Sequence, residues 1–295
     1  MFTGSIVALV TPFTDDGRAV DFDKLDELIE RQIAAGTQGI LPCGCTGEAA
    51  TCSHDEQEAV IERTVKTVNR RVKVIAGTGS NNTAEAIRLT RFAADAGADG
   101  ALVITPYYNK PTPEGQFLHY KAIAEAASIP LMLYNVPGRT GTKMLPETIA
   151  RLYKEIPSVL AVKEACGSVD QVSAILHLCD ITVLSGDDSL TLPMMAVGAT
   201  GVVSVVANVV PEEVVAMTNA WHAGDTEEAR RIHYQILPLC KAMFLETNPM
   251  PVKTTLQMMG LLNGVLRLPL CAMTETGTAG LRKALLDYGL PLAVY

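Results

Sequence analysis

Lys163 is the residue of this sequence best placed to carry covalent chemistry. It follows four apolar residues in the stretch VLAVKEA, which is typical of a buried strand, whereas most other lysines follow helical spacing or lie in polar loops. Burial disfavours the charged form of an amine, so the pKa of such a lysine falls. The neutral amine is the form that makes a Schiff base with a carbonyl. The alternative is a structural lysine paired with a buried carboxylate such as Glu164 or Asp187.

Further polar side chains follow other apolar runs. The stretches TPYYNKP, LYNVPGRTG and SGDD contribute Tyr107, Tyr108, Tyr134, Asn135, Arg139, Gly186 and Asp187. A tyrosine hydroxyl can relay a proton, and a guanidinium binds a carboxylate through two hydrogen bonds. Each residue alone has a structural explanation, because tyrosines often only pack and arginines often pair with surface acids. Their shared position after apolar runs is what indicates one site.

Two cysteines, Cys43 and Cys45 in LPCGCTGEAAT, raise the question of a metal or redox site. Residues two apart on a strand face the same way, so both thiols could point inward. Structural zinc, however, prefers gaps of about two to four residues and a second ligand pair, and His54 is the only nearby histidine. A disulfide between them would be strained. The sequence therefore predicts no metal site here.

The elements that position these residues are short apolar runs alternating with helical patterns. The runs are continuously apolar, as in parallel strands covered on both faces. Three segments, AGTQGIL, AGADGAL and VGATGVV, repeat a helix end followed by a strand start. Ser53 with Glu56 predicts a capping box, and Asn82 predicts another helix start. The expected strands cover residues 5–10, 39–43, 72–77, 100–105, 130–135, 159–164, 181–185 and 201–206.

Eight strand–helix units predict an α/β fold of the (β/α)8 barrel type. A doubly wound open sheet is the alternative, although no G-x-G-x-x-G follows the first strand. The catalytic barrel is expected over residues 1–224 and a C-terminal helical region over residues 225–295. Catalytic groups of such a barrel lie at the C-terminal ends of its strands. Lys163 and the polar loops should therefore meet at one face.

Composition excludes several classes of protein. The net charge of −8 gives no footprint for nucleic acid or an anionic membrane. No apolar stretch reaches the length of about 18 residues that a membrane-spanning helix needs, so none is expected. The start MFTGSIVALVTPF lacks the positively charged region of a signal peptide. Seven irregularly spaced cysteines without a CxxC indicate a cytoplasmic protein with reduced thiols.

Nine motifs together resemble the dihydrodipicolinate synthase family, within the pyruvate-dependent class I aldolases that include N-acetylneuraminate lyase. They are FTGSIVALVTPF, GCTGEAAT, VIAGTGSNNTAEAI, TPYYNKPTPEGQ, LYNVPGRTG, VKEA, LSGDD, GVVSVVANVVP and NPMPVK, and they run nearly end to end. The arginine in YNVPGRTG resembles the synthase branch. The resemblance implies condensation of pyruvate with L-aspartate 4-semialdehyde in the diaminopimelate route to lysine, without metal or dissociable cofactor.

The resemblance also implies catalytic roles. Lys163 would form the Schiff base with pyruvate, and Tyr134 would donate and accept the proton at the reacting carbon. Tyr108 would complete a proton relay by reaching in from a neighbouring subunit. Cys45 stands where the family has a threonine or serine hydroxyl that links the two tyrosines.

Substrate-binding residues follow from the resemblance in the same way. Thr46 and the backbone near Val203 would hold the pyruvate carboxylate, and Gly186 would lie near the pyruvate. Arg139 would bind the carboxylate of the second substrate. The family is commonly a homotetramer built from tight dimers, with an inhibitory lysine site at the dimer interface. Residues matching that site are Ala50, His54, Gly79, Asn81, Glu85 and Tyr107, whereas Gln57 replaces a histidine that is frequent in lysine-sensitive members.

Cys45 leaves three interpretations open. A thiol is a weaker hydrogen-bond partner than a hydroxyl and is mostly protonated at neutral pH. In the first, the relay runs through sulfur at a reduced rate; in the second, the second substrate differs; in the third, the chain is an altered form of a threonine-carrying enzyme. Three functions compete accordingly: the synthase, a sister aldolase or dehydratase acting on another pyruvate-derived acid, and a non-catalytic lysine-binding paralogue.

Overall fold

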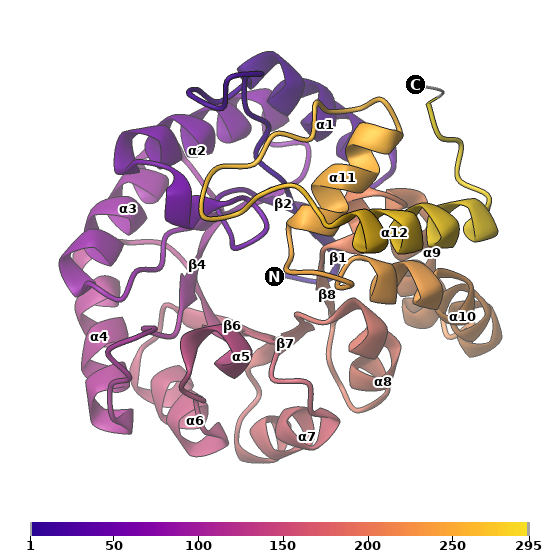
Figure 1. Cartoon of the computed structure of the whole chain (residues 1–295). Coiled ribbons are helices and arrows are strands. Elements are labelled where there is room, and N and C mark those ends of the chain that lie inside the picture. Colours follow the sequence, from indigo (N-terminus) through magenta and orange to yellow (C-terminus); the bar gives the residue numbers. More distant parts are fainter. Residues whose placement is uncertain (1, 294–295) are drawn as a thin grey trace.

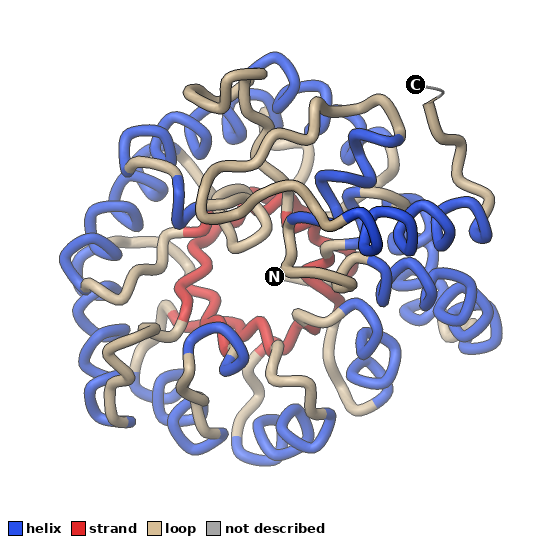
Figure 2. Tube along the Cα trace, viewed as in Figure 1, coloured by secondary structure: helices blue, strands red, loops and turns tan. Residues whose placement is uncertain are grey.

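Eight parallel strands close into a barrel in the computed structural model, which describes residues 2–293 (Figures 1 and 2). Each strand pairs with the next, and β8 pairs with β1. This closure confirms the predicted (β/α)8 barrel and excludes the open-sheet alternative. The strands are β1 (Gly4–Ala8), β2 (Gly39–Leu41), β3 (Lys73–Gly77), β4 (Gly100–Ile104), β5 (Leu131–Asn135), β6 (Val159–Glu164), β7 (Thr182–Ser185) and β8 (Gly201–Ser204).

Helices surround the barrel and follow the strands in the expected order (Figure 1). Ser53 and Glu56 form the predicted capping box, and Asn82 caps the next helix through its side chain. The helices are α1 (Phe22–Ala34), α2 (His54–Val68), α3 (Thr83–Ala96), α4 (Pro113–Ala126), α5 (Pro137–Thr140), α6 (Pro146–Glu155), α7 (Val169–Leu178), α8 (Thr191–Ala196), α9 (Pro211–His222), α10 (Thr226–Ala242), α11 (Met250–Met258) and α12 (Glu275–Tyr288).

All eight predicted strands are present, and their ends differ from the predicted ones by at most two residues. The difference that matters for the site is at β2, which ends at Leu41 and not at Cys43. Cys43 has a φ of +55°, a left-handed conformation that cannot continue a strand. The residues from Cys43 onward therefore form a loop, and strand alternation does not govern their side chains.

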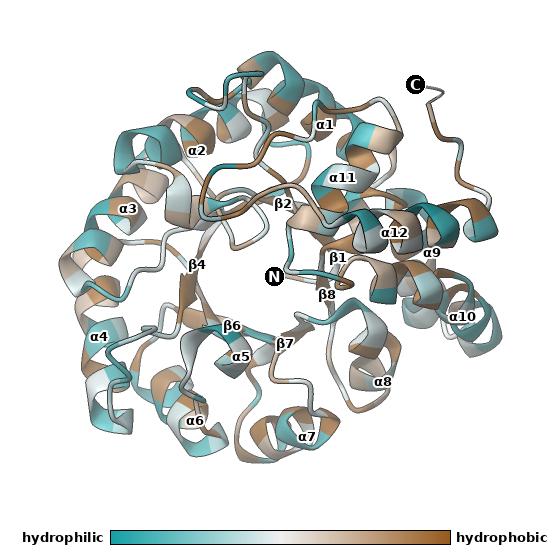
Figure 3. Cartoon of the chain, in the orientation of Figure 1, coloured by the Kyte–Doolittle hydropathy of each residue, from teal (hydrophilic) through white to brown (hydrophobic). Residues whose placement is uncertain are grey.

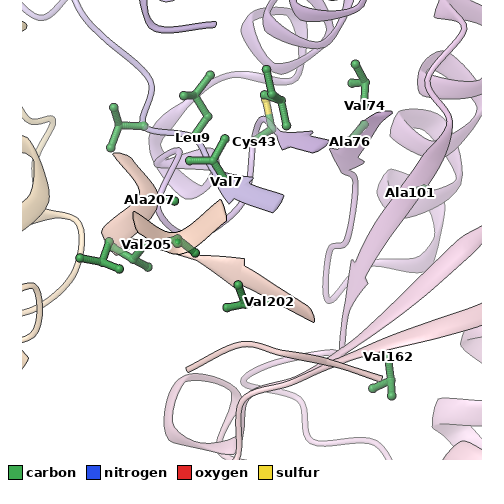
Figure 4. Packing of buried hydrophobic residues seen from close by; sticks show 14 of the residues in the cluster. Val7, Leu9, Cys43, Val74, Ala76, Ala101, Val162, Val202, Val205 and Ala207 are labelled. Atoms are coloured by element: carbon green, nitrogen blue, oxygen red, sulfur yellow. The ribbon is translucent and has the colours of Figure 1, made fainter. Parts of the chain in front are cut away.

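Two hydrophobic layers hold the barrel together. The inner layer fills the barrel and contains Ile6 and Ala8 of β1, whereas Val7 between them belongs to the outer layer beneath the helices. This alternation is the period of two that a strand imposes. Polar residues cover the sides of the helices that face away from the strands (Figure 3). Figure 4 shows part of the outer layer, including Val7, Leu9, Cys43, Val74, Ala76, Ala101, Val162, Val202, Val205 and Ala207.

The last three helices lie against the barrel and share its outer hydrophobic layer, which includes Ile236 of α10, Leu256 of α11 and Leu285 of α12. The segment between α11 and α12 crosses the barrel face at which the strands end (Figure 1). Pro269 and Leu270 of this segment line the cavity described below. The division at residue 224 stays a prediction.

Candidate active site

Lys163 lies on β6 with its side chain inside the barrel. Its neighbour Ala161 belongs to the inner layer and Val162 to the outer layer, so the alternation of the strand directs Lys163 inward. Tyr134 is its register partner on β5. The Lys163 Nζ lies 4.4 Å from the centroid of the Tyr134 ring. The predicted Schiff-base lysine and the predicted proton-transfer tyrosine are thus side by side.

The Lys163 amine has no ion-pair partner among residues 2–293. Glu164, fully buried, accepts hydrogen bonds from Asn135 and from the backbone of Cys166, and Asp187 caps the turn at Ser189. Glu164 and Asp187 are therefore not ion-pair partners of Lys163.

Burial lowers the pKa of Lys163 to about 8, and the nearby positive charge of Arg139 acts in the same direction. Cys45 and Asp188 act in the opposite direction. The Asp188 carboxylate is itself fixed by the backbone N–H groups of Val205 and Val206, at 3.0 and 2.9 Å. A useful fraction of the amine is therefore neutral near pH 8, as nucleophilic attack requires.

Tyr134 is 5% exposed, and burial raises the pKa of its hydroxyl well above the ordinary value. The neighbouring Cys45 raises this pKa further, whereas Arg139 lowers it. The hydroxyl therefore remains protonated at neutral pH, in the form that can donate a proton.

The two cysteines after β2 have different surroundings, so the expectation that both point inward is wrong. Cys45 is half-buried and packs against the inner layer. Cys43 belongs to the outer layer, and its Sγ contacts the Gln57 carbonyl oxygen at 3.7 Å. Burial raises the pKa of the Cys43 thiol. Only Cys45 is placed to act together with Tyr134 and Lys163.

Arg139 and Thr46 are joined through Asn248, which precedes α11. Arg139 Nη2 donates to the backbone carbonyl oxygen of Asn248 at 3.0 Å. The Asn248 Nδ2 donates to Thr46 Oγ1, also at 3.0 Å. The structure therefore brings together two residues that the resemblance assigns to two different carboxylates.

Gly186 lies beside Lys163, and Val203 belongs to the same inner layer as Ala161. Val203 of β8 is buried in the inner layer. Gly186 follows β7, and its N–H donates to the Glu164 carbonyl oxygen at 2.8 Å. A Cβ at Gly186 would lie 2.6 Å from the Ala165 Cβ and 3.0 Å from the Lys163 Cε. The glycine is therefore required to leave room for the lysine.

Changing Gly186 to alanine is expected to lower kcat/KM by at least about tenfold, because a displacement of the Lys163 stem misplaces the nucleophile. Steady-state kinetics would measure the loss. The matched control is Gly138→Ala, since nothing lies within 4 Å of the added methyl group. Equal kinetics in both variants would contradict the crowding argument.

A cavity of about 470 Å³ opens at the barrel face and is lined by Cys45, Tyr134, Arg139 and Asn248. Lys163 and Thr46 do not line it, but each contacts a residue that does, namely Tyr134 and Asn248. The same cavity is lined by five of the residues matched to the lysine site, Ala50, His54, Gly79, Glu85 and Tyr107, together with Gln57.

The predicted lysine site thus adjoins the predicted active site. His54 Nε2 lies 3.8 Å from a Glu85 carboxylate oxygen, and Ser80 Oγ donates to the same oxygen at 2.7 Å. Asn81 is not among the lining residues, and its carbonyl oxygen accepts from Asn109 Nδ2 at 2.9 Å. The Gln57 amide donates inward to the carbonyl oxygens of Ala49 and Cys52.

Tyr107 and Tyr108 occupy the loop after β4. Tyr108 is 90% exposed with a φ of +67°, and Tyr107 is 37% exposed. The single chain therefore does not bring Tyr108 to Tyr134, and Tyr108 does not reach the active site of its own barrel.

Within residues 2–293, no group of three or more His, Cys, Asp or Glu side chains could hold a metal ion. None of the described helices has both the length and the apolar character of a membrane span.

Comparisons with known proteins agree with this geometry. The model of the "Dihydrodipicolinate synthetase family" matches residues 1–287. A 4-hydroxy-tetrahydrodipicolinate synthase from Geobacter sulfurreducens is 56% identical over 292 residues, covering 98% of this chain and 100% of the relative.

Two solved structures carry informative ligands. The dihydrodipicolinate synthase of Acinetobacter baumannii complexed with pyruvate superposes with a TM-score of 0.96 at 45% identity, covering 99% of this chain and 100% of the other. That of Cyanidioschyzon merolae with lysine bound gives a TM-score of 0.95 at 40% identity, covering 98% and 99%.

The similarity extends over nearly the whole chain, and the relatives share one named activity. A sister aldolase and a non-catalytic paralogue are therefore not favoured. The chain belongs to the dihydrodipicolinate synthetase family, and it is a Schiff-base-forming lyase with the activity of a 4-hydroxy-tetrahydrodipicolinate synthase.

Proposed function

We propose that Lys163 carries the reaction by forming a Schiff base with pyruvate, whose enamine then attacks L-aspartate 4-semialdehyde. The observation that supports this most directly is the inward, unpaired Lys163 amine beside Tyr134, with a pKa lowered by burial. Attack of the product's amine on the imine closes the ring and frees Lys163. The family uses this covalent adduct and no dissociable cofactor, and the reaction belongs to the diaminopimelate route to lysine.

The other site residues take roles that suit their surroundings. Tyr134, held protonated by burial, exchanges the proton at the reacting carbon. Thr46 and the backbone near Val203 hold the pyruvate carboxylate, with Gly186 beside the pyruvate. Arg139, which lines the cavity, binds the carboxylate of the second substrate.

We also propose a homotetramer built as a dimer of dimers, in a cytoplasmic location. The 90% exposure of Tyr108 supports a partner subunit that receives this side chain. L-lysine is the proposed inhibitor at Ala50, His54, Gly79, Asn81, Glu85 and Tyr107. The seven unpaired cysteines suit a reducing compartment.

Trapping tests the proposal directly. Pyruvate with cyanoborohydride should convert the Schiff base to a stable adduct, located on Lys163 by mass spectrometry after digestion. An adduct on another lysine, or none on the folded protein, would contradict the assignment.

The pH dependence of trapping gives a second prediction. Because burial favours the neutral amine, the pKa of Lys163 is about 8. The initial trapping rate at pyruvate concentrations well below half-saturation should rise about tenfold per pH unit below pH 8 and level off above it. Measuring this rate between pH 6 and 10.5 checks the expectation. A rate that still rises tenfold per unit above pH 9 would indicate an ordinary exposed lysine.

Replacing Cys45 with threonine should raise kcat by about three- to tenfold, because a hydroxyl is a stronger hydrogen-bond partner than a thiol in a proton relay. Steady-state kinetics on both substrates would measure it. Cys179→Thr is the control, since Cys179 lies in the outer layer in an extended conformation that threonine adopts readily, does not line the cavity and should leave kcat unchanged. An unchanged or lower kcat for Cys45→Thr would exclude a relay slowed by sulfur.

A further inference from the structure

Asn248 is a buried residue that contacts two substrate anchors at once. Its side chain donates to Thr46 and its backbone accepts from Arg139, each at 3.0 Å. It is 4% exposed and lines the cavity. Its Oδ1 has no hydrogen-bond partner within residues 2–293, so the side chain is held through Nδ2 alone.

The bond to Thr46 orients a hydroxyl that could otherwise rotate. An amide NH₂ group can only donate, so the Thr46 Oγ1 accepts from Asn248 Nδ2. The hydroxyl proton of Thr46 is then left to donate to another acceptor. A ligand carboxylate is such an acceptor, and a hydrogen bond to a charged group is stronger than one to a neutral group.

The backbone carbonyl of Asn248 acts in a similar way on Arg139. It occupies one N–H of the guanidinium at 3.0 Å and so fixes the plane of the group. Arginine has five N–H donors in a rigid planar arrangement, so the remaining ones stay available for a carboxylate. One residue therefore sets the direction of both anchors.

A buried ion pair fixes the segment that carries Asn248. Lys253 of α11 is fully buried and donates to Glu48 Oε1 at 2.6 Å and to the Thr11 carbonyl oxygen at 2.9 Å. Its ammonium lies 4.3 Å from the centroid of the Phe13 ring. Glu48 lies two residues after Thr46. Residues 248–253 therefore contact the loop after β2 at two points, through the Asn248–Thr46 hydrogen bond and the Lys253–Glu48 ion pair. The proposed chemistry uses neither Lys253 nor Glu48.

We propose that Asn248 is a positioning residue that links Thr46 to Arg139 and so sets the spacing and direction of the two carboxylate-binding groups. This inference rests on the proposed function, because the carboxylates concerned are those of pyruvate and of the second substrate. Asn248 touches no reacting atom. Its loss should weaken binding and leave the covalent step at Lys163 intact.

The test compares Asn248→Ala and Asn248→Asp with the native chain. Asn248→Ala should raise the pyruvate concentration for half-maximal trapping about fivefold, the effect of one lost hydrogen bond, with the maximal trapping rate within about twofold. Asn248→Asp should raise it more, because an aspartate accepts the Thr46 proton that the ligand needs. A residue that only fills space would give the reverse order, since aspartate has nearly the shape of asparagine.

Two further measurements complete the test. In a Thr46→Val background, Asn248→Ala should cause no further rise in half-saturation, because its partner hydroxyl is already gone. Asn263→Ala is the matched control. Asn263 also ties the C-terminal region to the loop after β1, through the Phe13 carbonyl oxygen at 2.8 Å, but does not line the cavity. In Asn263→Ala, the pyruvate concentration for half-maximal trapping should stay within about twofold of the native value.

Thermal melting establishes that each variant is folded, and the nearly isosteric Asn248→Asp carries the comparison if the alanine variant is not. Two results would overturn the positioning role. One is a native-like pyruvate concentration for half-maximal trapping in the folded Asn248 variants. The other is a further rise of this concentration when Asn248→Ala is added to Thr46→Val. Normal trapping in the native chain would then leave the proposed function intact. Absence of trapping in the native chain would instead overturn the function itself.

Discussion

Changing Lys163 to arginine is expected to abolish pyruvate trapping and to lower kcat by a factor on the order of 10⁴ or more, the scale seen when a covalent nucleophile is removed. Arginine is similar in length but remains protonated at any working pH, so it cannot attack a carbonyl. Mass spectrometry of the cyanoborohydride-treated protein and steady-state kinetics together measure both effects.

Lys73→Arg is the control for this change. Lys73 opens β3 at the opposite end of the barrel, and its exposed amine pairs with Asp99 at 2.6 Å. An arginine there keeps the ion pair, so trapping and kcat should match those of the native chain. An adduct that persists in Lys163→Arg, or that disappears in Lys73→Arg, would place the Schiff base on another residue.

The sequence was sufficient to predict Lys163 and Tyr134 because strand periodicity determines their direction. A run of apolar residues identifies β6, and the period of two then places Lys163 on the inner face with Ala161. Neighbouring parallel strands bring the end of β5 beside it, so Tyr134 becomes the register partner. Both positions follow from local pattern and from the topology of the barrel, whereas the catalytic role of Tyr134 was implied by the family resemblance and stays a proposal.

The predicted strand end at Cys43 is wrong because one backbone angle ended the strand early. The positive φ of Cys43 turns the chain after Leu41, and the two thiols then lie in different layers. Cysteine gives no sequence signal for a left-handed conformation, unlike glycine or asparagine. A pattern that reads as one continuous strand therefore gave the wrong direction for Cys43.

Asn248 and Lys253 were missed for a different reason. The Asn248–Thr46 bond joins residues 202 positions apart, and the Lys253–Glu48 pair joins residues 205 positions apart. Short-range patterns carry no information about such partners. The motif NPMPVK, residues 248–253, was noted only as part of the family resemblance. The fold shows that Asn248 and Lys253 contact the loop after β2.

Changing Tyr134 to phenylalanine should lower kcat by about 10²- to 10⁴-fold, the usual contribution of a positioned proton donor and acceptor. The ring remains, so its contact with the Lys163 amine 4.4 Å away is kept and the loss in kcat reports on the hydroxyl alone.

Tyr120→Phe is the matched control. Tyr120 is also buried, but its hydroxyl donates to the Val103 carbonyl oxygen at 3.1 Å outside the cavity. That variant should lose about 1 kcal/mol of stability and keep its kcat within about twofold. Steady-state kinetics and thermal melting of both variants decide the matter, because a similar fall in kcat for the two would mean that the Tyr134 hydroxyl supports the fold and does not transfer the proton.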